Sequence, residues 1–233
     1  MNVPDGVFVT GTGTEVGKTV VAATIARTLS AGGKRVAVFK PAVTGLEEFT
    51  ADGPQSEQIG RFEARRPDHV MLRDAAESAQ SDEEVAPYRY GPPMSPHLAA
   101  ALAGEEISPE RLLDAARAAV ASADALVCEG VGGLLVPLKS DYLVRDLAAD
   151  LGLPLVIAAS PGLGTINHTL LTIESARSAG LEVTMVVLTP WPEKPSAIEQ
   201  SNRETIAALG EVQVKTLPRL DLDDPEQWPA VAL

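Results

Sequence analysis

The segment at residues 10–20 reads TGTGTEVGKTV and combines glycines, hydroxyl side chains and one lysine. A Walker A phosphate loop has a glycine, four further residues and then Gly-Lys-Ser or Gly-Lys-Thr. Gly17, Lys18 and Thr19 supply the end of that pattern, but Thr12 stands where the first glycine is expected, with glycines on both sides. Backbone amides at a helix start can surround an anion. The segment therefore predicts a modified phosphate loop, in which Lys18 contacts the phosphates of a nucleotide and Thr19 reaches Mg²⁺.

Two more charged residues end apolar runs. Lys40 follows VAVF and precedes Pro41, and Glu129 follows ALVC and precedes a glycine-rich stretch. The carboxyl ends of parallel strands form the crevice in which open α/β sheets bind ligands. A buried carboxylate is costly unless it meets a cation or donors, so Glu129 indicates the Mg²⁺ of a nucleotide complex. Taken alone, Lys40 also fits a surface lysine, and Glu129 also fits a capped glutamate before a turn.

Short β-branched runs alternate with amphipathic segments along the chain. The expected strands are residues 7–10, 36–40, 125–129, 155–159, 183–189 and 212–217. The expected helices are residues 19–31, 109–121, 143–151, 166–179 and 197–209. Such alternation predicts an α/β fold: a doubly wound, mainly parallel sheet with helices on both faces, of the P-loop NTPase type. We expect a single domain over residues 1–233.

The segment at residues 45–104 interrupts this alternation. It is rich in Pro, Asp, Glu and Arg, and its clearest helical piece is at residues 56–65. We interpret it as an excursion over the active face, not as a second domain, and its role stays open.

Composition excludes several classes of function. A net charge of −13 and a sequence pI near 4.6 argue against a nucleic-acid or anionic-membrane partner. The single cysteine, Cys128, makes an internal disulfide impossible and a cysteine metal site improbable. No signal peptide or membrane-length apolar run is present, so we expect a cytoplasmic protein.

Five motifs together resemble one family. They are GTGTEVGKT, KPAVTG, PMSPHLAAA, EGVGGLLVP and GLGTINHTLLT, in this order. Their types and separations resemble those of dethiobiotin synthetases, from Val7 to about Arg219. In this resemblance the phosphate loop is the family's own Walker A variant. Composition and spacing by themselves reach only a Mg-nucleotide enzyme of the P-loop class.

The resemblance implies an ATP-dependent cyclo-ligase reaction in biotin biosynthesis. Diaminononanoate and CO2 form a carbamate, a carbamate oxygen attacks the γ-phosphorus to give a carbamoyl-phosphate mixed anhydride, and the second amine closes the ring. The products are dethiobiotin, ADP and phosphate. The resemblance also implies Mg²⁺ as cofactor and a homodimer, with the substrate carboxylate received by a helix start, often from the partner subunit.

Residue roles follow by matching motif positions. The catalytic residues implied are Lys18, Lys40 and Thr14. The nucleotide-binding residues implied are Glu15, Val16, Gly17, Lys18, Thr19, Val20, Glu129, Gly130, Val131, Gly132, Pro218, Arg219 and Leu220. The substrate-binding residues implied are Lys40, Thr44 and Asn167. For the metal we expect Thr19, Glu129 and Glu57, because a count from Lys40 without gaps best matches the family's aspartate to Glu57; Asp52 is a nearby substitute.

Two other classes of P-loop protein share part of this pattern. A partitioning or switch ATPase that regulates a partner carries a second loop lysine, and Gly13 stands at that position. The synthetase half of a cobyrinate-type amidotransferase needs a glutaminase domain with a nucleophilic cysteine, and Cys128 lies inside an apolar run.

Nucleotide choice depends on the end of the run at residues 183–189. Many family members place an asparagine there, whose amide can make two hydrogen bonds to adenine. This chain has Leu188 or Thr189 at that place. We therefore expect relaxed nucleotide choice, although backbone groups around Pro218, Arg219 and Leu220 could still read adenine.

Overall fold

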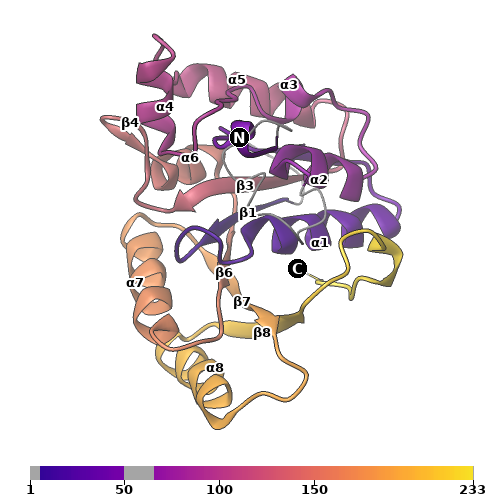
Figure 1. Ribbon diagram of the computed structural model, residues 1–233, viewed down its shortest axis with the longest axis vertical. Coiled ribbons are helices and arrows are strands. Elements are labelled where there is room, and N and C mark those ends of the chain that lie inside the picture. The colour runs from indigo at the N-terminus through magenta and orange to yellow at the C-terminus, as the bar shows by residue number, and fades with distance from the viewer. Residues whose placement is uncertain (1–5, 50–65, 233) are drawn as a thin grey trace.

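The computed structural model describes residues 6–49 and 66–232, and these form a six-stranded sheet with helices on both faces (Figure 1). The strands are β1 (Gly6–Gly11), β2 (Val36–Phe39), β3 (Ala125–Gly133), β6 (Leu155–Ala159), β7 (Val183–Trp191) and β8 (Gln213–Pro218). Their order is β2-β3-β1-β6-β7-β8, and every pairing is parallel. The doubly wound parallel sheet is thereby confirmed.

Five expected helices are present, each within one residue of its predicted ends. They are α1 (Lys18–Ala31), α5 (Pro109–Val120), α6 (Val144–Leu151), α7 (Thr165–Ser178) and α8 (Ala197–Gly210). Short elements that were not expected are α2 (Asp68–Ala75), α3 (Asp82–Val85), α4 (Pro96–Leu102), the hairpin of β4 (Pro137–Lys139) and β5 (Tyr142–Leu143), and two 3-10 turns at Leu46–Phe49 and Pro225–Gln227. None of the helices in the described part of the chain is long and apolar enough to cross a membrane.

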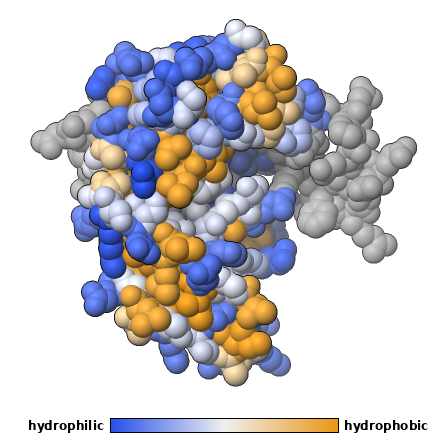
Figure 2. Space-filling view, turned by 90° about the vertical axis from the view of Figure 1, so that its left-hand side faces the viewer, coloured by the Kyte–Doolittle hydropathy of each residue, from blue (hydrophilic) through white to orange (hydrophobic). Residues whose placement is uncertain are grey.

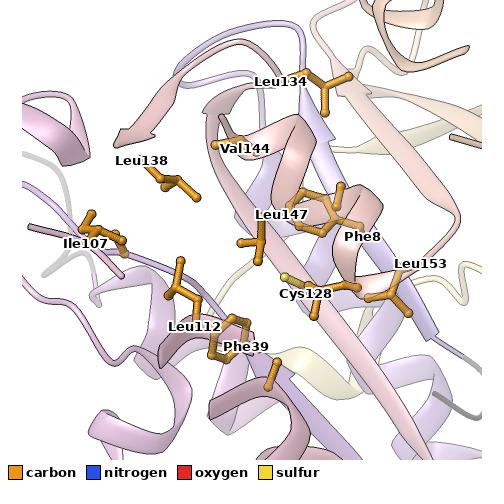
Figure 3. Packing of buried hydrophobic residues seen from close by; sticks show 14 of the residues in the cluster. Phe8, Phe39, Ile107, Leu112, Cys128, Leu134, Leu138, Val144, Leu147 and Leu153 are labelled. Carbon is orange, nitrogen blue, oxygen red and sulfur yellow. The ribbon is translucent and has the colours of Figure 1, made fainter. Parts of the chain in front are cut away.

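The sheet buries alternate residues of each strand on opposite faces. On one face Phe8 and Cys128 pack against Leu147 of α6 (Figure 3). On the other face Val9 and Val127 pack with the apolar side of α1 and with part of α2. Burying one such side chain contributes about 1.5–3 kcal/mol, and this double burial holds the strand ends, where the charged residues lie, in fixed positions.

The described part of the excursion at residues 45–104 covers the edge strand β2. The Lys40 amide donates to the Val85 carbonyl at 2.8 Å. The side-chain amide of Gln80 pairs with both backbone groups of Val38, at 2.8 and 3.1 Å. An unpaired strand edge is a template for association, so this return of the chain satisfies the edge and fixes the end of β2. The helix expected at residues 56–65 lies outside the described residues.

Candidate active site

The loop between β1 and α1 folds back closely on itself and on its neighbours. A Cβ added at Gly11 would lie 2.7 Å from Val16 Cγ2, and one at Gly17 would lie 2.5 Å from Thr189 Cγ2. Gly17 also has a φ of 87°, a left-handed conformation that favours glycine. Both glycines are therefore required by the shape of the loop. The loop leads directly into α1, as a phosphate loop does.

Lys18 lies at the base of this loop. It is 8% exposed, and its Nζ donates to the Gly13 carbonyl at 2.7 Å. Burial lowers the pKa of Lys18, and the nearby Glu129 carboxylate partly offsets that effect. Thr14 and Glu15 form the exposed tip of the loop, and Val16 and Val20 are half-buried.

Three predicted residues meet at the carboxyl ends of β2 and β3. Lys40 Nζ lies 2.7 Å from Glu129 Oε1. The Thr19 hydroxyl donates to the same oxygen at 2.9 Å. Lys40 is 3% exposed and Glu129 is fully buried. A buried carboxylate is therefore paired with a buried ammonium and a hydroxyl donor, immediately beside the phosphate loop.

A fourth residue completes this group, and the sequence analysis missed it. Asp68 Oδ2 lies 3.0 Å from Lys40 Nζ, and the Asp68 side chain is 44% exposed. Asp68 is the first residue of α2, after Pro67. Proline followed by aspartate at the start of a helical repeat is a helix-start signal, and that signal could have drawn attention to Asp68. We call Thr19, Lys40, Asp68 and Glu129 the charged cluster.

The third metal ligand was expected at Glu57, which was chosen by counting residues from Lys40. Glu57 and its substitute Asp52 both lie outside the described residues, so their roles stay predictions. The count assumed no extra residues between β2 and the following helix, and the acidic residue that lies beside Lys40 and Glu129 in the structure is Asp68.

The charges of the cluster support one another. Burial alone would lower the pKa of Lys40, but the carboxylates of Asp68 and Glu129 outweigh it and raise that pKa above its ordinary value. Burial opposes ionisation of Asp68 as well, yet the Lys40 ammonium brings its pKa below the ordinary value. Burial raises the pKa of Glu129, and Lys40 limits the increase. Lys40 is thus held in its charged form.

The oxygen atoms of the cluster fit a magnesium ion. Glu129 Oε2 is buried and has no hydrogen-bond partner within the described part of the chain. Such an orphaned carboxylate oxygen is costly unless a cation or water satisfies it. In residues 6–49 and 66–232 no three His, Cys, Asp or Glu side chains group as a metal site. Two carboxylates and a hydroxyl are what Mg²⁺ uses when phosphates and waters complete its shell.

The stretch after Glu129 leaves little space on its inner side. A Cβ at Gly130 would lie 2.9 Å from the Phe8 ring, and Gly132 has a φ of 62°. Val131 and Gly132 are half-buried. These residues therefore expose backbone, not side chains, at the carboxyl end of β3.

The remaining predicted substrate residues lie on two other segments. Thr44 is half-buried just after β2, and Asn167 is exposed in the first turn of α7. The loop before α7 is held by Asn202 of α8, whose side-chain amide donates to the carbonyls of Pro161 and Gly162 at 2.9 and 3.1 Å. Asn202 is buried, and no local pattern in the sequence indicated it.

The ends of β7 and β8 lie beside each other. Thr189 is 3% exposed and packs on the phosphate loop at Gly17. Leu188 is fully buried. Of the three residues expected to read the base, Pro218 and Arg219 are exposed and Leu220 is half-buried.

Comparisons with known proteins agree with this geometry. A family model described as "AAA domain" matches residues 5–225. The chain is 43% identical over 183 residues to the ATP-dependent dethiobiotin synthetase BioD of Anaeromyxobacter dehalogenans, over 78% of this chain and 75% of that protein. It is 34% identical over 204 residues to the Bacillus subtilis protein of the same name, over 88% and 82% of the two chains. The Bacillus licheniformis protein is 37% identical over 223 residues, or 95% and 89%.

Solved structures with a similar fold include one of a nucleotide-hydrolysing protein. The ParA family ATPase from Chlorobium tepidum TLS matches with a TM-score of 0.54 and 15% identity, over 95% of this chain and 87% of that one. At this identity the likeness concerns the fold alone.

Proposed function

Because the chain belongs to the dethiobiotin synthetase family, we propose that it closes a cyclic urea on diaminononanoate with CO2 and ATP. The products are dethiobiotin, ADP and phosphate, and the protein is an ATP-dependent cyclo-ligase of biotin biosynthesis. The observation that carries the proposal is the charged cluster beside the phosphate loop. Lys40, Thr19 and Glu129 come from three of the matched motifs, and both Lys40 and Thr19 donate a hydrogen bond to Glu129 Oε1.

The reaction gathers negative charge at one place. One substrate amine captures CO2 as a carbamate, and a carbamate oxygen attacks the γ-phosphorus while ADP leaves. The second amine then attacks the carbamoyl carbon, the C–O bond breaks, and phosphate departs with that oxygen. Lys18 and Lys40 are the cations that the chain brings to these anions. A buried ammonium that is already oriented stabilises developing charge without reorganisation, so we assign Lys40 to the carbamate and γ-phosphate.

Thr19, Asp68 and Glu129 would hold the Mg²⁺ of the nucleotide complex. Mg²⁺ bound there would neutralise phosphate oxygens during transfer. Of the three, Asp68 replaces Glu57 in our proposal, because Asp68 lies beside Lys40.

The loop tip and the start of α7 supply substrate contacts in this proposal. We assign Thr14 and Glu15 to orientation of substrate and phosphates, and Thr44 to the substrate amine or carbamate. Asn167, with the free amides of the first turn of α7, receives the substrate carboxylate, because a helix N-terminus favours an anion. The backbone of Gly130, Val131 and Gly132 and of Pro218, Arg219 and Leu220 would border the nucleotide.

We further propose a homodimer in the cytoplasm. Exposed leucines lie on α4, the β3–β4 turn, the loop before α7 and α7 itself: Leu98, Leu102, Leu135, Leu163 and Leu171. Apolar side chains gather on the face that carries these elements (Figure 2). Exposed apolar patches of this kind mark contact sites, and a second copy here would lie next to the proposed carboxylate site.

The dimer proposal is tested by sedimentation. We expect Leu163→Asp and Leu171→Asp together to give a monomer with a raised KM for the diamine. Leu222→Asp, an equally apolar exposed position on the C-terminal segment, is the control and should leave the dimer intact. A fully active wild-type monomer at assay concentration would reject the proposal.

Phosphate release with and without the diamine tests the function itself. The enzyme should release phosphate from Mg-ATP rapidly only when diaminononanoate and bicarbonate are both present. A partner-regulating ATPase of the partitioning type would hydrolyse ATP at the same rate with or without the diamine.

A further inference from the structure

The Lys40 ammonium lies where two carboxylates meet. Its Nζ is 2.7 Å from Glu129 Oε1 and 3.0 Å from Asp68 Oδ2. Lys40 and Glu129 are both buried, so their contact is shielded from water, whereas the Asp68 side chain is 44% exposed. Asp68 and Glu129 are also the carboxylates whose chemistry fits a divalent cation. An ammonium and a metal ion would therefore compete for the same two carboxylates.

The hydrogen bonds of the cluster are unevenly shared. Glu129 Oε1 receives both Lys40 and the Thr19 hydroxyl, whereas Oε2 of the same carboxylate is buried with no hydrogen-bond partner among the described residues. One oxygen of Glu129 is therefore satisfied and the other is not. A cation with several coordination positions, unlike an ammonium, could engage both carboxylates and the Thr19 oxygen at once.

The charges around Lys40 are balanced. Lys18 and Lys40 face Asp68 and Glu129, and among the described residues these two carboxylates have the largest charge effects on Lys40. Adding a divalent cation to two ammoniums and two carboxylates would leave uncompensated positive charge in a largely buried place, which is costly. A metal can therefore enter in two ways: by displacing Lys40 from the carboxylates, or together with an anion that receives Lys40.

We propose that Lys40 is an internal counter-cation that the metal replaces. Binding of the metal–nucleotide complex transfers Asp68 and Glu129 from the ammonium to the metal and releases Lys40 to the anionic reactants. A nucleotide without metal leaves Lys40 paired with the carboxylates. Metal loading thereby controls when the Lys40 charge becomes available for catalysis.

The metal competition can be measured without substrates. The release of Lys40 to the carbamate rests on the proposed function, but the sharing of two carboxylates by an ammonium and a metal does not. If the chain makes no dethiobiotin while Lys40 and metal compete, the proposed function fails and this inference stands.

The experiment is a calorimetric titration of Mn²⁺ into the full-length protein without nucleotide. We expect Lys40→Met to bind Mn²⁺ about tenfold or more tightly than the wild type, because the competing cation is gone. Mg²⁺ should also raise the melting temperature of Lys40→Met by more than that of the wild type, because the metal then neutralises Glu129. Neither readout needs catalysis.

Two variants localise the effect. Lys18→Met removes the neighbouring ammonium, whose Nζ donates to a carbonyl and not to the carboxylates. Its gain in Mn²⁺ affinity should be clearly smaller than that of Lys40→Met. The double variant Lys40→Met with Asp68→Asn should lose most of the gain, because one of the shared ligands is neutral.

Every outcome decides the question. Mn²⁺ affinity in Lys40→Met that equals or falls below that of the wild type overturns the proposal, and so does an equal gain in Lys18→Met. Lys40→Gln, which keeps a donor for Glu129, is measured if Lys40→Met does not fold. Folding of both variants only when Mg²⁺ is added supports the proposal, and failure to fold with and without Mg²⁺ rejects it.

Discussion

The two halves of the sheet's carboxyl edge are built differently. At the ends of β2 and β3, the buried Lys40 contacts the buried Glu129 at 2.7 Å and the partly exposed Asp68 at 3.0 Å. At the ends of β6, β7 and β8, the proposed site consists of backbone, the exposed Asn167 and the small Thr189. The first half is fixed by ion pairs, and the second is fixed by loops such as the one that Asn202 holds.

In our proposal the half at β2 and β3 acts in the reaction, and the half at β6 to β8 recognises the substrate and the base. A buried ion pair depends on each partner, because removing one leaves an uncompensated charge. Each hydrogen bond from a backbone amide or an exposed side chain contributes less free energy, and neighbouring groups can replace it. We therefore expect substitutions near β2 and β3 to affect turnover strongly, and substitutions near β7 to shift preference by modest factors.

Lys40→Gln should give the largest effect. Turnover should fall about a hundred- to a thousandfold or more, because the ammonium acts on charge that grows in the transition state. Glu129 also loses the buried ammonium that balances its charge, so a cost of about 3–5 kcal/mol in unfolding free energy is expected. Dethiobiotin formation and denaturant unfolding measure the two effects.

Lys139→Gln is the matched control for this substitution. Lys139 lies on β4 with its nearest carboxylates at 3.6 and 3.7 Å, so its ion pairs are weak surface contacts. Near-normal turnover in Lys40→Gln, or equal losses in both variants, would remove the distinction between the two halves.

Asp68→Asn should give the next largest effect. Loss of one metal-associated carboxylate should lower metal affinity or activity about ten- to a hundredfold, with a higher Mg²⁺ requirement. Asp74→Asn is the control on the same helix, since Asp74 pairs with Arg66 and Arg73 on the surface. Rates measured over a Mg²⁺ series test this; an unchanged Mg²⁺ requirement in Asp68→Asn would return the metal role to Glu57 or Asp52.

The choice of nucleotide base tests the other half of the edge, at the end of β7. Thr189 packs on Gly17 and is 3% exposed, and Leu188 offers no polar group. A bidentate contact to a base contributes about 1–3 kcal/mol to discrimination between bases. Without it, nucleotide binding depends mainly on the phosphates. CTP or GTP should therefore support turnover within about tenfold of ATP. Steady-state rates with the four nucleotides check this, and a preference for ATP of several hundredfold would contradict it.

The smallest expected effect is the pH dependence of stability. Burial opposes ionisation of Asp68, but Lys40 outweighs it and lowers the pKa of Asp68. Ionised Asp68 thus stabilises the fold above the ordinary carboxyl pKa of about 3.9, and this contribution disappears as pH falls through the lowered value. The difference in unfolding free energy between wild type and Asp68→Asn should be about 1 kcal/mol near neutral pH, because Asp68 is partly exposed.

Urea unfolding at a series of pH values measures that difference. It should stay constant between about pH 6 and pH 8 and shrink below about pH 4. A difference that grows toward acid would show that Asp68 is not stabilised as a carboxylate.

The sequence predicted the strands, the helices and the edge of the sheet at which ligands bind, because local patterns and strand direction determine them. Strand and helix bounds followed from periodicity, and the placement of Lys40 and Glu129 at one edge of the sheet followed from its parallel strands. Their direct ion pair was not predicted, because Mg²⁺ was the expected partner of Glu129. Asp68 could not be reached by counting, because local physics does not set the number of residues between β2 and α2. Asn202 gave no signal, because a single amide on a polar helix looks the same whether it is buried or exposed.

We propose that the charged cluster beside the phosphate loop acts in ATP-dependent ring closure. To test this, the purified protein is incubated with diaminononanoate, isotope-labelled bicarbonate and Mg-ATP, and dethiobiotin is followed by mass spectrometry together with ADP. We expect product that carries one labelled carbon, with one ADP formed per dethiobiotin, and no product from Lys40→Gln. ADP release without labelled dethiobiotin, or labelled product at the wild-type rate from Lys40→Gln, would overturn the proposal.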